Sequence, residues 1–196
     1  MDKLITYDNL QDILKGKGML FFTGHMNLNL IGIRTMNRNI NNFDDKFCMA
    51  WEDNGEKKLF VNNDFTTDPG IYYLQKELLS PKGCAILVPG QYRGLWKIGF
   101  HRGKYKALVQ DKPCSVYRDR NKDNYLDFDS STIETGMFGI NKHHGYESAV
   151  VNNNSAACQV DRYKKDLDFS LSVAKKSVSL YGENITYTLI TSNDFI

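Results

Sequence analysis

Residues 84–119, CAILVPGQYRGLWKIGFHRGKYKALVQDKPCSVYRD, contain four short runs of aliphatic and aromatic residues separated by turn-forming residues. Runs of this length and composition predict β-strands, and the HRGK sequence at 101–104 predicts the turn of a hairpin. Similar runs flank this stretch: MLFFTG, NLIGIRTM, KFCMAWED, KKLFVNN and GIYYLQ, with turn sequences DNGE (53–56), TDPG (67–70) and SPKG (80–83). Many short strands at roughly 8–12-residue spacing favour an antiparallel sandwich or barrel.

The two ends of the chain differ from this strand-rich middle. Residues 1–18 are predicted to form a short N-terminal helical extension. Residues 161–177 place apolar side chains at near-helical spacing, with Asp161 as the expected N-cap and Gly182 as the stop. NITYTLIT (184–191) alternates like a closing strand. We therefore expect one domain over 1–196, mainly β, with a helix at the start and another after Cys158.

Bulk composition indicates an ordinary globular protein. The 196 residues are 41% hydrophobic, and 25 basic against 23 acidic residues give a net charge of +2. Neither a nucleic-acid partner nor a membrane span is expected, since no window approaches the roughly 18 consecutive apolar residues that a spanning helix needs. The acids and amides near the N-terminus do not suit a signal peptide, so we expect synthesis in a cytoplasm.

Four cysteines lie at 48, 84, 114 and 158, with no CxxC pair. Neither a zinc ribbon nor a disulfide framework is expected in a chain of this length and spacing. Cys48 and Cys84 lie within apolar strand-like runs and are predicted to be core thiols. Cys158 has small, polar neighbours and is therefore the cysteine of interest.

The stretch HHGYESAVVNNNSAACQV (143–160) allows three interpretations of Cys158. It could be a nucleophile activated by His143 or His144 and by the N-terminus of the helix expected about three residues later. It could be a metal ligand with His143, His144 and His101, although adjacent strand histidines point to opposite faces. It could also be an ordinary thiol in a loop.

The order of these residues resembles the L,D-transpeptidase family of YkuD type, the cysteine enzymes of peptidoglycan. That family has a histidine at a strand end and, some fifteen to twenty residues later, a Ser-x-Gly-Cys string before a helix; GINKH (139–143) and SAAC (155–158) are similar. TTDPGIYYL (66–74) is similar to the family's TPxGxY string. GQYR, HRGKYKALVQ and GMFGINKH also resemble a divergent phage and Bacteroidetes-type branch, so that the resemblance spans roughly residues 19–191.

The resemblance implies an L,D-transpeptidase-like β fold and a set of roles. Cys158 would be the nucleophile and His143 the general base, oriented by a backbone carbonyl near His144. Ser155 would shape the loop, and the amides around Ala157 and Cys158 would form an oxyanion hole. The implied substrate is a peptidoglycan stem peptide, cut or cross-linked without a cofactor.

The chain departs from the family pattern at three places. Ala157 replaces the glycine before the nucleophile, which costs roughly 1 kcal/mol or more if that position needs a positive φ. Gln159-Val160 replaces an apolar residue followed by Arg or Asn, and Ala156 replaces a second histidine. A non-catalytic virion or structural protein that binds partners through the same fold is therefore the alternative. Without a signal peptide, a phage-type product would reach the wall by lysis or with a virion.

A basic segment, residues 91–106, interleaves five cations with aromatic residues and contains no acid. It could be a solvated hairpin face, a weak nucleic-acid surface, or a groove for an anionic stem-peptide carboxylate. In the last case Arg93 is the best bidentate candidate, and Tyr92, Arg93 and His144 would bind substrate.

Residues 119–130 offer a calcium candidate. Asp119, Asn121, Asp123 and Asp127 fall at positions 1, 3, 5 and 9 of an EF-type loop, but Ser130 stands where the bidentate Glu belongs. A polar hairpin turn is the competing interpretation.

Overall fold

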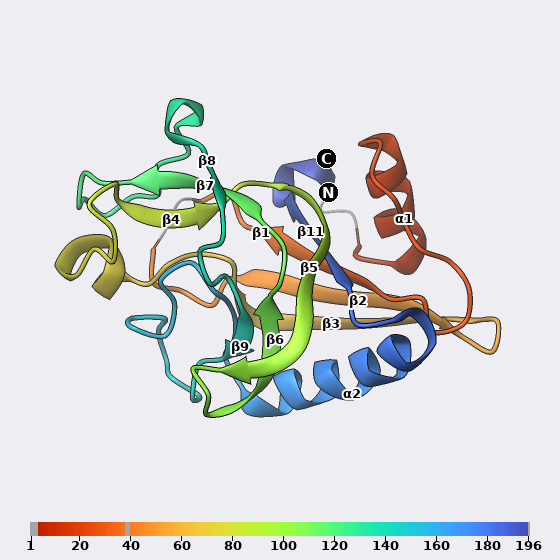
Figure 1. Ribbon diagram of the computed structural model, residues 1–196. Coiled ribbons are helices and arrows are strands. Elements are labelled where there is room, and N and C mark those ends of the chain that lie inside the picture. The colour runs from red at the N-terminus through yellow and green to blue at the C-terminus, as the bar shows by residue number, and fades with distance from the viewer. Residues whose placement is uncertain (1–3, 38–39, 196) are drawn as a thin grey trace.

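A closed, eight-stranded β-barrel forms the body of the protein in a computed structural model that describes residues 4–37 and 40–195 (Figure 1). Around the barrel the order is β1-β11-β5-β6-β9-β10-β3-β2. The bounds are β1 Asn29–Arg34, β2 Asp45–Asp53, β3 Glu56–Thr66, β5 Gly90–His101, β6 Tyr105–Gln110, β9 Lys142–His144, β10 Gln159–Asp161 and β11 Ile185–Thr191. The predicted mainly β fold, with a short N-terminal helix and a helix after Cys158, is confirmed. Residues 1–3 of the predicted N-terminal extension lie outside the described residues.

The barrel is mostly antiparallel, as expected, but two of its strand pairs are parallel. β1 pairs in parallel with β11, and β9 pairs in parallel with β10. Parallel neighbours need a long crossover connection, and residues 145–158 supply one between β9 and β10. This crossover carries the chain from His143 back to Cys158 and sets them on neighbouring strands.

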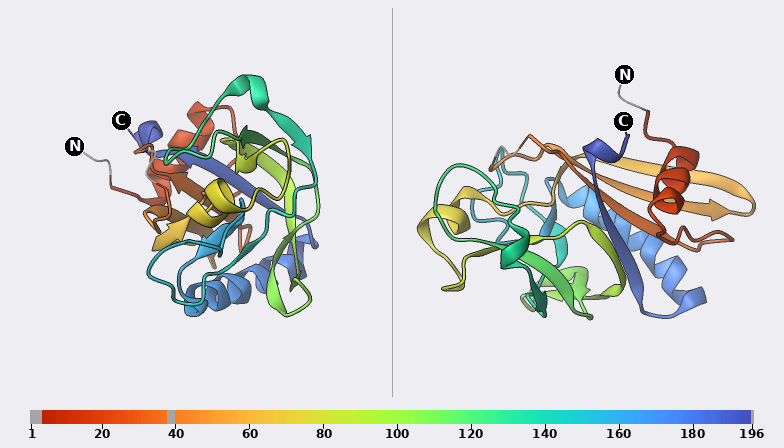
Figure 2. Two further views of the ribbon diagram at one scale, coloured as in Figure 1. Left: turned by 90° about the vertical axis from the view of Figure 1, so that its left-hand side faces the viewer. Right: turned by 90° about the horizontal axis from the view of Figure 1, so that it is seen from above.

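A second sheet of three strands lies beside one end of the barrel (Figure 2). It has the order β4-β7-β8, with β4 Cys84–Leu87, β7 Cys114–Asp119 and β8 Glu134–Gly136. The 3-10 turn Ser130–Thr132 stands between β7 and β8. The runs CAILV and CSVYRD are thus strands as predicted, but of this smaller sheet.

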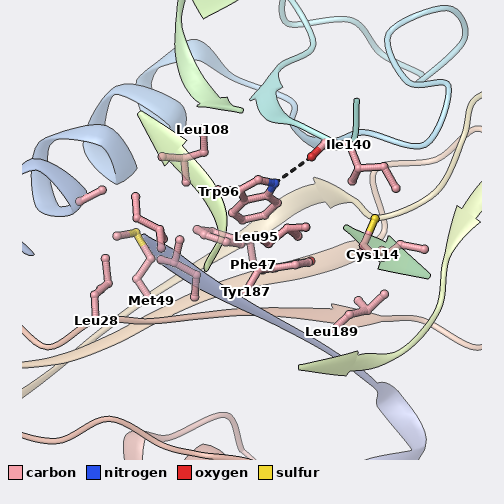
Figure 3. Close-up of a cluster of buried hydrophobic side chains, with 14 of the residues drawn as sticks. Leu28, Phe47, Met49, Leu95, Trp96, Leu108, Cys114, Ile140, Tyr187 and Leu189 are labelled. Carbon is pink, nitrogen blue, oxygen red and sulfur yellow. Dashed lines mark hydrogen bonds between the residues drawn. The ribbon is translucent and has the colours of Figure 1, made fainter. Parts of the chain in front are cut away.

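Trp96 occupies the centre of the barrel core (Figure 3). Its indole is fully buried and stacks on Tyr187 at 4.3 Å between ring centroids. Its Nε1 donates a 2.8 Å hydrogen bond to the carbonyl of Ile140. A buried indole N–H needs such an acceptor, and this one holds the segment that leads into β9 and His143.

Two α-helices cover the barrel. α1 (Tyr7–Gly16) begins at Thr6, whose hydroxyl accepts from the Asn9 amide at 3.1 Å, and it buries Leu10 and Leu14. α2 (Lys164–Tyr181) ends at Gly182, which takes a φ of 87°. This stop agrees with the prediction. The expected N-cap is wrong, because Asp161 belongs to β10 and its carboxylate is paired inside the core.

Two predicted strands are absent from the described residues, and the strand before His143 is shorter than expected. MLFFTG (19–24) forms no strand. The Asn29 side chain accepts a hydrogen bond from the Phe22 amide and donates one to the Phe22 carbonyl, in place of a neighbouring strand. GIYYLQ forms instead a helical turn, Tyr72–Lys76, which buries Leu74. β9 begins only at Lys142, because Gly139 takes a φ of 73°.

Within the part of the chain that the structure describes, no helix combines the length and apolar character required to cross a membrane.

Candidate active site

His143 lies on β9, and Cys158 immediately precedes β10, the parallel neighbour of β9. In their parallel register Val160 lies opposite His143, and the Gln159 amide donates to the Asn141 carbonyl at 2.8 Å. Residues two apart along a strand share a face with the directly paired residue. Cys158 therefore falls on the His143 side of the sheet, one residue before the start of β10.

His143 is held in one tautomer by a backbone carbonyl. It is 3% exposed, and its Nδ1 lies 2.9 Å from the carbonyl oxygen of His144. A carbonyl only accepts, so Nδ1 carries the proton and Nε2 is left as a base. The Tyr105 hydroxyl lies 3.4 Å from the same Nδ1. The orienting carbonyl is the one that the family resemblance implies.

The imidazole of His101 stacks on that of His143, with 4.1 Å between centroids and 28° between planes. Burial and the neighbouring His101 lower the pKa of His143 to about 3. Burial and the nearby Arg102 lower the pKa of His101 to about 4. Both rings are therefore neutral at pH 7, which leaves His143 available as a proton acceptor.

The thiol of Cys158 is neutral at rest. Cys158 is partly exposed, and its Sγ lies 3.5 Å from the carbonyl oxygen of Gly139. Burial raises the pKa of the thiol, while the Asn141 amide and the charge of Arg102 act to lower it. The expected activation by a helix N-terminus is wrong, since α2 begins only at Lys164. The other three thiols, Cys48, Cys84 and Cys114, are core residues with pKa values raised to about 12 by burial.

The loop before Cys158 is fixed by Ser155. This buried hydroxyl donates to the Cys158 carbonyl at 2.9 Å and accepts from the Ala157 amide at 3.3 Å. The Ser155 carbonyl accepts from the Gly70 amide at 2.9 Å. The Cys158 amide meets no acceptor among the described residues, so it is the donor free for an oxyanion. The Ala157 amide, also expected in that role, is engaged by Ser155.

Ala157 takes a φ of 135°, a conformation that favours glycine. Position 157 therefore has the positive φ that makes alanine costly, and backbone strain of this kind costs of order 1–3 kcal/mol. Its methyl group is buried in the core cluster, which offsets part of that cost.

Gln159 anchors the loop from the other side. Its side chain is fully buried; Nε2 donates to the Thr67 carbonyl at 3.2 Å, and Oε1 accepts from the Tyr187 hydroxyl at 2.6 Å. Gln159 departs from the family pattern, and both polar atoms of its buried side-chain amide have hydrogen-bond partners.

Two cavities lie near the loop that ends at Cys158, although Cys158 itself lines neither of them. One, of 220 Å³, is lined by Tyr73, Cys84, Phe138 and Ala156 among others. The other, of 60 Å³, is lined by His101, Arg102, Lys104, Tyr105, His143, Tyr146, Asn153 and Asn154. The sequence interpretation included Arg102 and Tyr105 only as members of the basic segment 91–106 and gave neither a role of its own at the cysteine site. The signal for them was the HRGKY turn, because a hairpin tip brings its side chains together.

The expected substrate-binding residues are not all brought to this site. Tyr92 donates its hydroxyl to the Val88 carbonyl at 2.6 Å. Arg93 lies over the Phe22 ring and lines a separate cavity near the end of α2. His144 is at the site, with its ring centroid 4.5 Å from those of Tyr105 and Tyr146. The basic hairpin contributes through its tip, not through its first residues.

Neither metal interpretation finds a preformed set of ligands. The stacked rings of His101 and His143 cannot both aim in-plane lone pairs at one ion. In the calcium candidate, Asn121 donates to the carboxylates of Asp123 (2.9 Å) and Asp127 (2.8 Å), and the Asp127 amide donates to Asp119 (3.1 Å). Burial raises the pKa of Asp119 to about 6. Across residues 4–37 and 40–195, no three His, Cys, Asp or Glu side chains are grouped to hold a metal ion.

Comparison with known proteins found no relative of this chain. No protein-family model, no curated protein and no solved structure matches the chain. The arrangement of Cys158, His143 and their neighbours therefore has to be interpreted from its own chemistry.

Proposed function

We propose that the protein is a cysteine-dependent acyltransferase or peptidase of L,D-transpeptidase type that acts on peptidoglycan stem peptides. The observation that carries this proposal is the pairing of β9 with β10. Through this pairing Cys158 lies on the same face of the sheet as His143, whose Nδ1 is fixed by a backbone carbonyl and whose Nε2 makes no hydrogen bond among the described residues. The resemblance of GINKH and SAAC to that family's strings supports the choice of substrate.

The reaction proceeds through a thioester. As Cys158 Sγ attacks the carbonyl carbon of the scissile amide, its proton passes to His143 Nε2. The carbonyl oxygen becomes an oxyanion, which the Cys158 amide stabilises. Collapse of the tetrahedral intermediate breaks the C–N bond, and His143 returns the proton to the leaving amine. An acceptor amine or water then attacks the thioester, giving cross-linking or hydrolysis.

The protonation states of the resting site shape this route. A raised thiol pKa and an imidazole pKa near 3 disfavour a thiolate–imidazolium ion pair before substrate binds. Proton transfer must therefore accompany sulfur attack, not precede it. An oxyanion donor that is already positioned is then the main source of stabilisation.

The test is incubation of the protein with purified muropeptides, followed by intact-protein mass spectrometry. We expect an acyl adduct on Cys158 in the wild type, and neither adduct nor turnover in Cys158→Ala. Cys114→Ala is the matched control, because it removes a buried thiol of the small sheet and should leave the adduct in place. Failure of every tripeptide and tetrapeptide stem to acylate Cys158 would refute the proposal.

A non-catalytic binding module is the second candidate. Strain at Ala157 and the raised pKa of Cys158 favour it, because both act against an activated nucleophile. Such a module would retain wall or virion-protein binding in Cys158→Ala without any adduct. Sedimentation with purified peptidoglycan, compared between the wild type and this variant, separates the two functions.

A further inference from the structure

Three charged side chains are buried together where β1 ends and β2 begins. Arg34 closes β1, Asp45 opens β2, and Asp68 follows the end of β3 by two residues. None of the three residues is more than 6% exposed. Arg34 Nε lies 2.8 Å from Asp68 Oδ1. Two buried carboxyls therefore share one guanidinium, and a negative charge is left uncompensated if both are ionised.

Thr67 connects the two carboxyls. Its hydroxyl donates to Asp45 Oδ2 at 2.8 Å and lies 3.3 Å from Asp68 Oδ1. The same oxygen accepts a 3.0 Å hydrogen bond from Arg34 Nε. The backbone amide of Thr67 also donates to Asp45 Oδ2, at 2.7 Å. Because a hydroxyl has a single proton, it can donate to only one of the two carboxyls at a time.

The segment that begins at Thr67 holds the cysteine loop on both sides. After the cysteine, Gln159 Nε2 donates to the Thr67 carbonyl at 3.2 Å. Before it, the Gly70 amide donates to the Ser155 carbonyl at 2.9 Å. A displacement of this segment is therefore transmitted to both ends of the string that carries Cys158.

We infer that Asp45 and Asp68 form a proton-linked cluster that positions the Cys158 loop through Thr67. Two like charges cannot both form readily beside one hydroxyl in a buried site, so the pair takes up one proton from solvent. When Asp45 gains that proton at Oδ2, its new O–H donates to Thr67 Oγ1. The threonine hydroxyl then turns to donate to Asp68.

This exchange changes the hold on the loop. Ionised Asp45 accepts charge-assisted hydrogen bonds from both the amide and the hydroxyl of Thr67, and such bonds are roughly twice as strong as neutral ones. Protonated Asp45 is a weaker acceptor for that amide, so Thr67 moves and Gln159 moves with it. The consequence for acyl transfer rests on the proposed function, whereas the displacement of the loop does not.

The surroundings place the proton uptake near neutral pH. Burial and the charge of Asp68 raise the pKa of Asp45 to about 7, while two backbone amides and Arg34 act to lower it. Burial also raises the pKa of Asp68, with Arg34 opposing and Asp44 adding to the effect. The other titratable groups that face the cluster are Tyr187 of β11, Tyr92 of β5 and Tyr117 of β7, the last across a 60 Å³ cavity that Arg34 also lines. Burial raises the pKa of the first two phenols, so both stay neutral in this range.

The test is a pH titration of the isotope-labelled full chain, followed by two-dimensional amide NMR without any substrate. In the wild type the backbone amides of Thr67 and Cys158 and the side-chain amide of Gln159 should shift together, with one midpoint near pH 7. Asp45→Asn keeps the size of the side chain but cannot ionise, so it should abolish this common shift. Asp119→Asn is the matched control, because it removes a buried carboxyl of β7 that makes no contact with the Thr67 segment, and the shift should persist.

A second pair of variants keeps the test open if Asp45→Asn does not fold. Thr67→Val removes a hydrogen-bond donor to ionised Asp45, so the midpoint should rise. Thr67→Ser retains the hydroxyl and should leave the midpoint near pH 7. A midpoint that is equal in the two variants would contradict the proposed link through the hydroxyl.

Absence of a common shift in the wild type overturns the inference, and so does a shift that persists in Asp45→Asn. Where muropeptides acylate Cys158, the acylation rate should show the same midpoint in the wild type and lose it in Asp45→Asn; a rate without that midpoint would overturn the role in the reaction. The imidazoles of His101 and His143 do not supply it, because their pKa values are lowered to about 4 and about 3. Failure of every muropeptide would reject the peptidase function, and the NMR titration would still decide the positioning role.

Discussion

Replacing Lys142 by Met tests whether a buried ion pair holds the two strands of the site together. Lys142 on β9 pairs with Asp161 on β10, and both side chains are completely shielded from solvent. Lys142 also donates to Ser170 at 3.1 Å and lies 4.1 Å from the centroid of the Phe47 ring. Asp161 accepts a further 2.9 Å hydrogen bond from Asn62. In Lys142→Met the buried carboxylate of Asp161 would keep the Asn62 side-chain amide as its remaining partner.

The magnitude follows from these contacts. Removing one member of a buried pair costs about 3–5 kcal/mol in the free energy of unfolding. Replacing both, as Lys142→Met with Asp161→Leu, removes the uncompensated charge but leaves the Asn62 amide without its acceptor, at about 1–3 kcal/mol. The double variant should therefore be more stable than Lys142→Met alone. The exposed pair Lys164–Asp168 on α2 is the matched contrast, and Lys164→Met should cost under about 0.5 kcal/mol.

The assay is equilibrium urea unfolding, followed by far-UV circular dichroism and by tryptophan fluorescence, with reductant present.

The loss of unfolding free energy in Lys142→Met should also depend on pH. Burial already raises the pKa of Asp161 and Lys142 opposes it, so removing the lysine raises that pKa further. A carboxyl whose folded pKa exceeds its unfolded value stabilises most below the unfolded pKa, and this contribution is lost as pH rises. The deficit should be smallest below about pH 4, near the unfolded pKa of an aspartate, and grow toward neutrality. A loss below about 1 kcal/mol, well under the range for breaking a buried pair, or one equal to that of Lys164→Met, would refute the reasoning.

Three shorter predictions concern the cysteine loop. Ala157→Gly should be at least about 1 kcal/mol more favourable to stability than Ala156→Gly, because only the first relieves a positive φ; a chemical-denaturation comparison giving equal effects would remove strain as the cause. Gly70→Ala should destabilise the fold in the same assay, since its Cβ would come within 1.9 Å of the Asn152 carbonyl oxygen, and a variant as stable as the wild type would contradict that close approach. Alkylation of Cys158 by iodoacetamide should keep rising beyond about pH 9, because burial raises the pKa of this thiol above the ordinary value; a plateau below about pH 8 would show an activated thiolate instead.

The longer strands could be predicted from local patterns because each run is long enough to repeat its signal, whereas the three-residue strands β8 and β10 were not predicted. The hairpin β5–β6 follows directly from LWKIGFH, HRGK and KYKALVQ. The strand prediction for MLFFTG was wrong for a non-local reason, since the side chains of Asn29 and Gln91 bond the backbone at Phe22 and Leu20 that would otherwise join a sheet. GIYYLQ has strand-like composition, but its hydrogen bonds run back to the Gly70 carbonyl and wind it into a turn.

Some features of the candidate site could likewise be predicted from the sequence, and others could not. The spacing of His143 and Cys158 suggested partners, and the family resemblance implied a tautomer-fixing carbonyl near His144. The position of Arg102 and the stacking of His101 could not, since both residues approach His143 only through barrel closure, where β6 pairs with β9. The direction of the Cys158 pKa was also hidden, because burial is a property of the whole fold and not of the local string.

Arg102 acts on both reacting groups of the neutral resting site. Its charge is among the causes that lower the pKa of His143, and it also acts to lower that of the Cys158 thiol. Loss of that charge would remove this field at both groups. The imidazole would become a stronger base and the thiol a weaker acid, so the two changes oppose each other before reaction. The same opposition holds in the transition state, where a weaker positive field favours the proton on His143 but disfavours the negative charge on sulfur and on the oxyanion. The charge of Arg102 therefore supports negative charge on sulfur and on the oxyanion, and it weakens His143 as a base.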